Sequence, residues 1–224
     1  MQTTPKPISP VFLTLSALYL TCLLVSNLVA GKLTAFWGVT LPAAVVLFPL
    51  AYILGDIFTE VYGFRRTKLV IWLGFSCNFL ASAGYLLALA LPHPDFWTNQ
   101  EAYRTVLSVT PRLLLASLAG YLVGEFSNAV VLSRLKLKTQ GRMLWLRTIL
   151  STLVGEAADT LLFISIAFYG TVPTKVLLQM ILAQYLFKVC YEILFTPLTY
   201  WCVAAVKKVE KLDVFDKGES YRPF

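Results

Sequence analysis

Residues 41–66 read LPAAVVLFPLAYILGDIFTEVYGFRR, an apolar stretch of membrane-spanning length that carries two acids near its basic end. Asp56 and Glu60 lie one helical turn apart within it. On translocon scales, a carboxylate at the centre of a spanning helix costs roughly 2.5–3.5 kcal/mol. A simple anchor has no use for such charges. The stretch therefore predicts a membrane protein with a polar interior.

The composition of the whole chain supports this prediction. Hydrophobic residues make up 58% of its 224 residues and charged residues 14%, and no hydrophilic stretch is long enough to form a second domain. We predict one integral membrane domain over residues 1–224. The cysteines fall within apolar runs without a metal-ligand spacing, so no metal or cofactor is expected.

Apolar windows of about 20 residues predict an all-α, polytopic fold with six transmembrane helices. The windows cover about 11–31, 41–63, 69–91, 111–133, 149–170 and 176–206. On one side of the membrane, the connections contain only Lys32, Arg104, Arg112 and Lys175 as basic residues. The opposite side carries nearly all the others, so the positive-inside rule places both termini in the cytoplasm. This topology also explains the formal charge of +7 without a nucleic-acid partner.

Polar side chains at helical spacing share one face of several predicted helices, so we expect them to line a common cavity. The predicted substrate-binding residues are Asn27, Tyr52, Asp56, Asn78, Tyr121, Glu125, Asn128, Glu156, Asp159, Gln184, Lys188 and Glu192. Glu60 lies nearer the cytoplasmic end. We predict that it pairs with Arg65 or Arg66 as a gate or helix-end contact. Ala116, Gly120 and Gly124 form an adjacent strip that permits close helix packing, within the monomer or across a homodimer.

The predicted interior holds an excess of negative charge. Its acids are Asp56, Glu60, Glu125, Glu156, Asp159 and Glu192, and its only base is Lys188. Since these acids cannot all be both ionised and paired, some must carry a proton or bind a ligand, which motivates a hypothesis of proton coupling. Carboxylates among aromatic rings suit a flat, nitrogen-rich heterocycle, because a carboxylate can accept two hydrogen bonds from a guanine-like N–H and amine.

Four longer segments carry a family resemblance: FPLAYILGDIFTEVYGFRR, TPRLLLASLAGYLVGEFSN, TQGRMLWLRTILSTLVGEAADTLLF and QYLFKVCYEILFTPLTY. They resemble the queuosine precursor transporter family, six-helix bacterial membrane proteins of the vitamin-uptake type. The resemblance implies uptake of 7-cyano-7-deazaguanine, and of the 7-aminomethyl form, across the inner membrane for queuosine salvage into transfer RNA. The matching motif residues are Asn27, Asp56, Glu60, Glu125, Asn128, Glu156, Asp159, Gln184, Lys188 and Glu192.

Other functions remain as alternatives. The chain could be the substrate-binding subunit of a larger energised importer, which has a similar number of helices. An intramembrane aspartyl protease is disfavoured because Ile53 stands where a G-x-G-D motif needs glycine and Ala158 precedes Asp159. An ion channel is disfavoured by Lys188 among the acids and by the many aromatic residues. We therefore expect a transporter rather than an enzyme.

Overall fold

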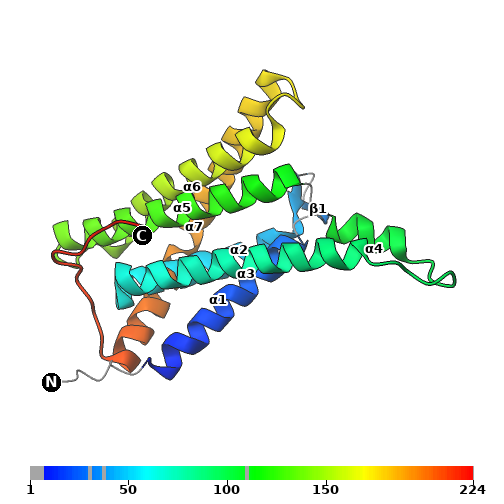
Figure 1. The fold of residues 1–224 in the computed structure, drawn as a ribbon. Coiled ribbons are helices and arrows are strands. Elements are labelled where there is room, and N and C mark those ends of the chain that lie inside the picture. The colour runs from blue at the N-terminus through cyan, green and yellow to red at the C-terminus, as the bar shows by residue number, and fades with distance from the viewer. Residues whose placement is uncertain (1–7, 30–31, 37–38, 109–110, 224) are drawn as a thin grey trace.

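The computed structural model describes residues 8–29, 32–36, 39–108 and 111–223. Helices dominate it, and the longer ones run along each other as a bundle (Figure 1). The elements in chain order are α1 (Pro10–Val29), β1 (Leu33–Phe36), β2 (Val39–Pro42), the short helix η1 (Ala43–Val46), α2 (Phe48–Ile57), η2 (Phe58–Tyr62), α3 (Phe64–Ala90), α4 (Gln100–Leu107), α5 (Pro111–Lys138), α6 (Leu144–Phe168) and α7 (Thr174–Glu210).

Within the described part of the chain, five helical stretches are long and apolar enough to cross a membrane. They are α1, α3, the stretch that ends with α5 at Lys138, α6 and α7. Their outward faces carry large apolar side chains, including Leu80, Leu87, Leu115, Leu194 and Trp201. Lipid can cover such faces, whereas a soluble monomer rarely exposes so much contiguous apolar surface. The prediction of a polytopic helical membrane protein is therefore confirmed.

The predicted span over 41–63 differs most from the structure. Its first residues belong to a small antiparallel hairpin, in which Leu33 of β1 pairs with Pro42 of β2. After η1, α2 begins at Phe48, with proline in its first turn, where the missing N–H has no helical partner to lose. The helix then widens into the π-helix η2. The all-α prediction needs this correction: a hairpin leads into a short, irregular helix.

The C-terminal segment caps the start of α3. Gly63 ends η2 with φ of 80°, and a Cβ at this position would lie 2.7 Å from Asp216 Oδ1. The Phe64 N–H donates to both carboxylate oxygens of Asp216, at 3.1 and 3.0 Å. Ser133 on α5 donates to the same carboxylate at 2.5 Å. Residues far apart in sequence therefore fix the end of α3, α5 and the C-terminal segment together.

The most extensive helix pair is α5 with α6, and its close approach depends on glycine. A Cβ on Gly124 would lie 2.8 Å from Asp159 Cβ, and one on Gly155 would lie 2.8 Å from Asn128 Cβ. Real Cβ atoms are not found so close together. The predicted strip of small residues is thus used inside the monomer, and a homodimer would need another surface.

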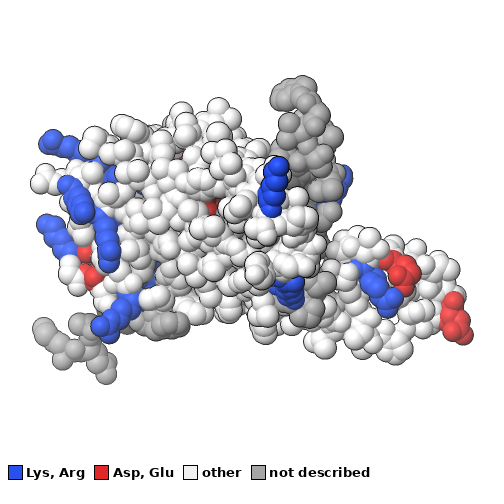
Figure 2. All heavy atoms as spheres, turned by 90° about the horizontal axis from the view of Figure 1, so that it is seen from above, with Lys and Arg blue, Asp and Glu red and all other residues white. Residues whose placement is uncertain are grey.

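Basic side chains concentrate at one end of the bundle. The start of α1, the end of α7 and the C-terminal segment all lie at this end (Figure 1). Figure 2 shows most of the visible lysines and arginines gathered there, with a broad uncharged band along the bundle. The opposite end carries the hairpin and α4.

Candidate functional site

A cavity of about 800 Å³ lies between α1, α2, α3, α5, α6 and α7. This volume is within the range of roughly 300–1,000 Å³ that is usual for small-molecule sites. All but one of the predicted binding residues line it: Asn27, Tyr52, Asp56, Asn78, Tyr121, Glu125, Asn128, Glu156, Asp159, Gln184 and Lys188. The residues that we predicted from helical spacing therefore meet in one cavity, although they come from six helices. Of the predicted residues, only Glu192 lies outside the lining.

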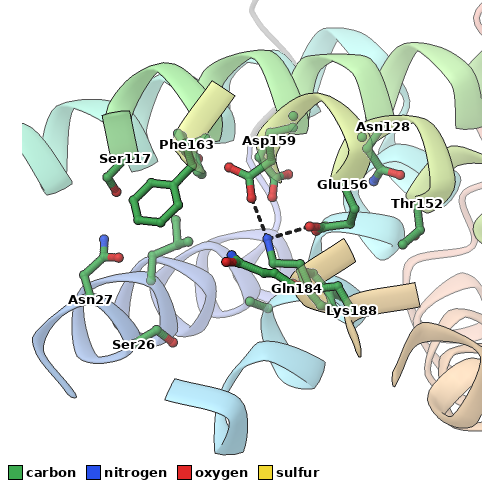
Figure 3. A pocket seen from close by; sticks show the side chains of 18 of the residues that line it. Ser26, Asn27, Ser117, Asn128, Thr152, Glu156, Asp159, Phe163, Gln184 and Lys188 are labelled. Carbon is green, nitrogen blue, oxygen red and sulfur yellow. Dashed lines mark hydrogen bonds and ion pairs between the residues drawn. The ribbon is translucent and has the colours of Figure 1, made fainter. Parts of the chain in front are cut away.

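A lysine and two acids form the most strongly charged contact of the cavity (Figure 3). Lys188 Nζ on α7 lies 2.6 Å from Glu156 Oε2 and 2.5 Å from Asp159 Oδ2 on α6. The Lys188 side chain is 9% exposed. Because Glu156 and Asp159 are three residues apart, they lie on one helical face and can both reach the same ammonium. We call these three residues the Lys188 cluster.

Amides and hydroxyls line other parts of the cavity. Asn27 on α1 donates to Asn78 on α3 at 2.6 Å, which ties these helices together. The Tyr121 hydroxyl lies 3.1 Å from the Ile71 carbonyl, to which it donates, and 3.4 Å from the Tyr19 hydroxyl. Aromatic rings from Tyr121 and Phe163 face the same space. The cavity therefore offers charge, hydrogen-bonding groups and flat apolar surfaces.

Asp56 and Asn128 meet in the cavity wall. Asp56 is 2% exposed, and its Oδ1 accepts a hydrogen bond of 3.4 Å from Asn128 Nδ2. The other carboxylate oxygen, Oδ2, and the amide oxygen of Asn128 are both buried, and neither has a hydrogen-bond partner among the residues that the structure describes. Buried acceptors without partners are costly, so these two oxygens mark an incomplete site.

Glu192 follows Lys188 by one turn of α7 but lies beyond the cavity. It is 3% exposed and does not belong to the lining. Its Oε1 is also buried and has no hydrogen-bond partner in the described part of the chain. The regular spacing of Gln184, Lys188 and Glu192 correctly identified one helical face, but the cavity ends at the level of Lys188.

The structure gives Glu60 different partners from the predicted Arg65 and Arg66. Glu60 is completely buried, and its Oε2 lies 2.6 Å from Arg147 Nη1. Its Oε1 lies 2.8 Å from Lys207 Nζ and 3.7 Å from Lys136 Nζ. We call Glu60, Arg147, Lys136 and Lys207 the Glu60 cluster. Arg65 is exposed, and the Arg66 guanidinium instead lies over the ring of Tyr62.

The C-terminal segment adds a further acid to the Glu60 cluster. Asp213 accepts from Lys136 and lies 2.9 Å from Lys207 Nζ. Partial burial acts to raise the pKa of Asp213, but the hydrogen bonds from Lys136 and Lys207 outweigh it and hold the pKa below its ordinary value. The segment is thereby bound to α5 and α7 as well as to α3.

The end of the cavity beyond Asp56 is closed by buried side chains. No residue of η2 lines the cavity, and all five of its residues are buried. Phe58 and Tyr62 pack edge-to-face against Phe12 of α1, with ring centroids 5.6 and 4.9 Å apart. Together with the Glu60 cluster, this aromatic packing separates the cavity from the basic end of the bundle.

Several lining residues were missed by sequence reasoning, and their spacing could have indicated them. Thr152 precedes Glu156 by four residues, and Phe163 follows Asp159 by four, so both continue the α6 face. Ser26 adjoins Asn27 on α1. The remaining residues that were not predicted are mostly apolar, including Met180 and Phe187, and nothing distinguishes these from lipid-facing positions.

Comparisons with known proteins give consistent matches. The family model described as "Putative vitamin uptake transporter" matches residues 42–202. A "Probable queuosine precursor transporter" of Bacillus subtilis is 27% identical over 176 residues, which are 78% of this chain and 77% of that protein. The "Queuosine precursor transporter" of Escherichia coli is 27% identical over 151 residues, 66% of each chain. No solved structure gives a significant match.

Proposed function

This chain belongs to the vitamin uptake transporter family, and from this premise we propose that it carries 7-deazaguanine precursors of queuosine into the bacterial cell. Its apolar helices and its bacterial relatives support a multi-pass protein of the inner membrane. The names of those relatives support queuosine precursors as the substrate class. A transporter rather than an enzyme is the role that these likenesses support.

The observation that carries the proposal is the composition of the cavity wall. A 7-deazaguanine has a flat bicyclic ring, an N–H and amine edge that donates, and a carbonyl that accepts. Acids of the Lys188 cluster can accept from such donors, while Lys188 and Gln184 can donate to the carbonyl or nitrile. The ring of Tyr121 or Phe163 offers a stacking surface. The cavity therefore provides complementary groups for every part of the molecule.

We propose that 7-cyano-7-deazaguanine and its 7-aminomethyl relative are both substrates. The 7-substituent projects from the edge of the ring, and a cavity of about 800 Å³ has room for either group.

We also propose that α2 with η2 acts as a sixth membrane-embedded element and that both termini face the cytoplasm. The gathering of basic side chains at the end shared by the start of α1 and the end of α7 supports this orientation.

The polar cavity and the closed basic end support transport by alternating access, in which the cavity opens to one side of the membrane at a time. The lining includes Asn27 near the end of α1 and Phe168 at the end of α6, whereas the basic end is sealed beyond Asp56. With the proposed orientation, the cavity extends toward the outer surface and is closed toward the cytoplasm. Substrate release inside then requires the Glu60 cluster and the aromatic packing to separate.

Uptake by the purified chain in proteoliposomes tests the proposal. We expect saturable accumulation of radiolabelled 7-cyano-7-deazaguanine that unlabelled precursor inhibits. Glu156→Ala should reduce uptake by about tenfold or more, since it removes a charged hydrogen-bond acceptor from the cavity. The matched control is Glu101→Ala, on the exposed α4. Binding without uptake would instead indicate the substrate-binding subunit of a larger importer. The absence of both binding and uptake would contradict the proposed substrate class.

A further inference from the structure

The C-terminal segment, residues 211–223, crosses the basic end of the bundle. It follows α7 and runs from there to α5 (Figure 1). Along this course it also contacts η2 and α3. We propose that the segment is a latch over the inner end of the cavity: it holds η2 and the start of α3, and it must release both before substrate leaves toward the cytoplasm. The inference rests on the proposed transport function and adds to it a part that moves.

The membrane helices form two groups, with the cavity between them. α5, α6 and α7 pack on one another as the two most extensive helix pairs, and we call them the C-terminal half. α1 packs on both α2 and α3, and we call these three helices, with η2, the N-terminal half. Both halves line the cavity. Opening its inner end therefore requires η2, which carries Glu60, to move away from the bases of the Glu60 cluster on α5, α6 and α7.

Asp216 links the two halves. It is 9% exposed, and its carboxylate accepts from the N–H of Phe64, the first residue of α3, and from the Ser133 hydroxyl on α5. The first N–H groups of a helix have no partner within it, so Asp216 satisfies a group that is buried here. Two residues earlier, the Val214 N–H donates to the Val61 carbonyl of η2 at 3.1 Å. The segment thus holds the junction of η2 and α3 against α5.

The last residues of the segment add exposed contacts with α3. Lys68 Nζ donates to the Arg222 carbonyl at 3.3 Å, and Trp72 Nε1 donates to the Pro223 carbonyl at 3.0 Å. Water can replace such bonds at the surface, so little free energy is needed to break them. They guide the segment back onto α3 without fixing it there.

Lys136 on α5 joins the latch to the Glu60 cluster. Its ammonium donates to the Glu60 carbonyl of η2 and, at 2.7 Å, to the Val214 carbonyl of the segment. It also contacts Asp213. Since η2 and the segment meet at the same ammonium, the bonds that hold them lie side by side. The Glu60 cluster closes the inner end from within the bundle, and the segment covers it from the side that we assign to the cytoplasm.

The form of the segment suits release. The described residues 211–223 form neither helix nor strand, and only Asp216 among them is buried. A segment with so few buried contacts detaches at a lower free-energy cost than a packed helix. The close contact of α5 with α6 is the opposite case, since the backbones meet there at Gly124 and Gly155. The segment is therefore the part of the closed end that can open and form again in each transport cycle.

A crosslink between the segment and α3 tests the latch. The native cysteines are first replaced by alanine: Cys22, Cys77, Cys190 and Cys202. Lys68→Cys with Arg222→Cys is then joined by a short bifunctional thiol reagent that reduction removes. We expect uptake of radiolabelled precursor into proteoliposomes to fall by about tenfold or more, because the segment can no longer leave the N-terminal half. Binding from the outer side should persist, and reduction should restore uptake.

The matched control joins the segment to the C-terminal half. Gln140, just after α5, and Lys217 in the segment are both exposed and line the same surface hollow. Gln140→Cys with Lys217→Cys, joined by the same reagent, should keep uptake within about twofold of the reduced protein. Unchanged uptake with the crosslink from Lys68 to Arg222 overturns the latch. Loss of uptake in the control overturns the direction of release, since the segment then has to leave α5.

A second measurement does not depend on crosslinking. Ser151 on α6 is completely buried and lies one turn from Arg147, toward the cavity. In the cysteine-free chain, Ser151→Cys reports inner opening through its modification by a membrane-impermeant thiol reagent at the cytoplasmic face. Asp216→Ala removes the link to Phe64 and should speed this modification by about tenfold, whereas Lys217→Ala should not. Equal rates in both variants overturn the latch. Failure of the parent chain to bind or take up precursor contradicts the proposed function itself.

Discussion

The Lys188 cluster and the Glu60 cluster have opposite charge ratios. In the first, one base serves two acids, and the side chains line an open cavity. In the second, one acid is surrounded by three bases and none of them lines the cavity. Both oxygens of Glu60 have partners. Asp56 and Glu192, in contrast, each have a buried oxygen with no hydrogen-bond partner within the described ranges.

This difference separates a cluster that holds the basic end closed from one that faces a ligand. A buried ion pair whose groups are mutually satisfied gains little from any further ligand, and removal of one member leaves uncompensated charge. Unpaired acceptors in a cavity wall behave in the opposite way, because a ligand or proton that forms a hydrogen bond with them removes the energetic cost of leaving them unpaired. Charge alone does not distinguish the two regions. The decisive feature is whether each buried polar atom has a partner within the protein.

The largest expected effect is on the Glu60 cluster. Glu60→Gln removes the carboxylate that Arg147, Lys207 and Lys136 share and leaves buried cations behind. We expect a loss of about 3–5 kcal/mol of stability, as is typical when one partner of a buried pair is removed. The measurement is the yield of monodisperse protein and its thermal unfolding in detergent.

A matched change at Asp56, in the cavity wall, sharpens the comparison. Asp56→Asn keeps the shape of the side chain and removes a negative charge from a group of acids, so the unfolding temperature should stay within a few degrees of wild type or rise. Equal destabilisation by Glu60→Gln and Asp56→Asn would show that the two regions do not differ in role.

The helical spans were predictable because each one is a long apolar run, and lipid-facing helices require such runs. The pairing of β1 with β2 was not, since these four-residue strands are too short for an alternating pattern to stand out. The cap on Phe64 was also beyond local reasoning, because its acceptor, Asp216, lies in the C-terminal segment. Contacts between distant segments leave no local pattern.

The candidate site was predictable to the extent that polar residues inside apolar helices are rare. Spacing of three or four placed Glu156, Asp159 and Lys188 on facing surfaces, and the structure joins them. The same spacing could not show where the cavity ends, which is why Glu192 was included with the lining. The partners of Glu60 were misassigned because proximity in sequence favoured Arg65, whereas the packing of α6 and α7 supplies Arg147 and Lys207.

A moderate effect is expected where α5 meets α6 beside the cavity. Gly155→Ala places a methyl group 2.8 Å from Asn128 Cβ and 2.9 Å from the Gly124 carbonyl, so the helices must move apart. We expect a loss of about 1–3 kcal/mol of stability from overpacking. Because the shift displaces Asn128 more directly than the Glu60 cluster, precursor affinity in a binding assay should fall as well.

The control for this change is Gly84→Ala on α3, where a Cβ meets nothing within 4 Å. That variant should keep wild-type affinity and gain slightly in helix stability. If Gly155→Ala binds precursor as wild type does, the contact between Gly155 and Asn128 does not position the cavity wall.

The smallest effect is expected at the rim of the Glu60 cluster. The Asp213 side chain is 44% exposed, so Asp213→Asn should cost no more than about 1 kcal/mol, which is the range of exposed ion pairs. Its pKa is lowered in the folded protein by hydrogen bonds from Lys136 and Lys207. The stabilising contribution is therefore complete above the ordinary aspartate pKa near 3.8 and is lost as the pH falls through the lowered folded value.

Limited proteolysis of the C-terminal segment should be faster in Asp213→Asn than in wild type at neutral pH, with the difference vanishing in acid. Glu219→Gln, in the same segment, should show no such difference. A large loss of stability in Asp213→Asn would mean that the segment, and not Glu60, holds the basic end of the bundle closed.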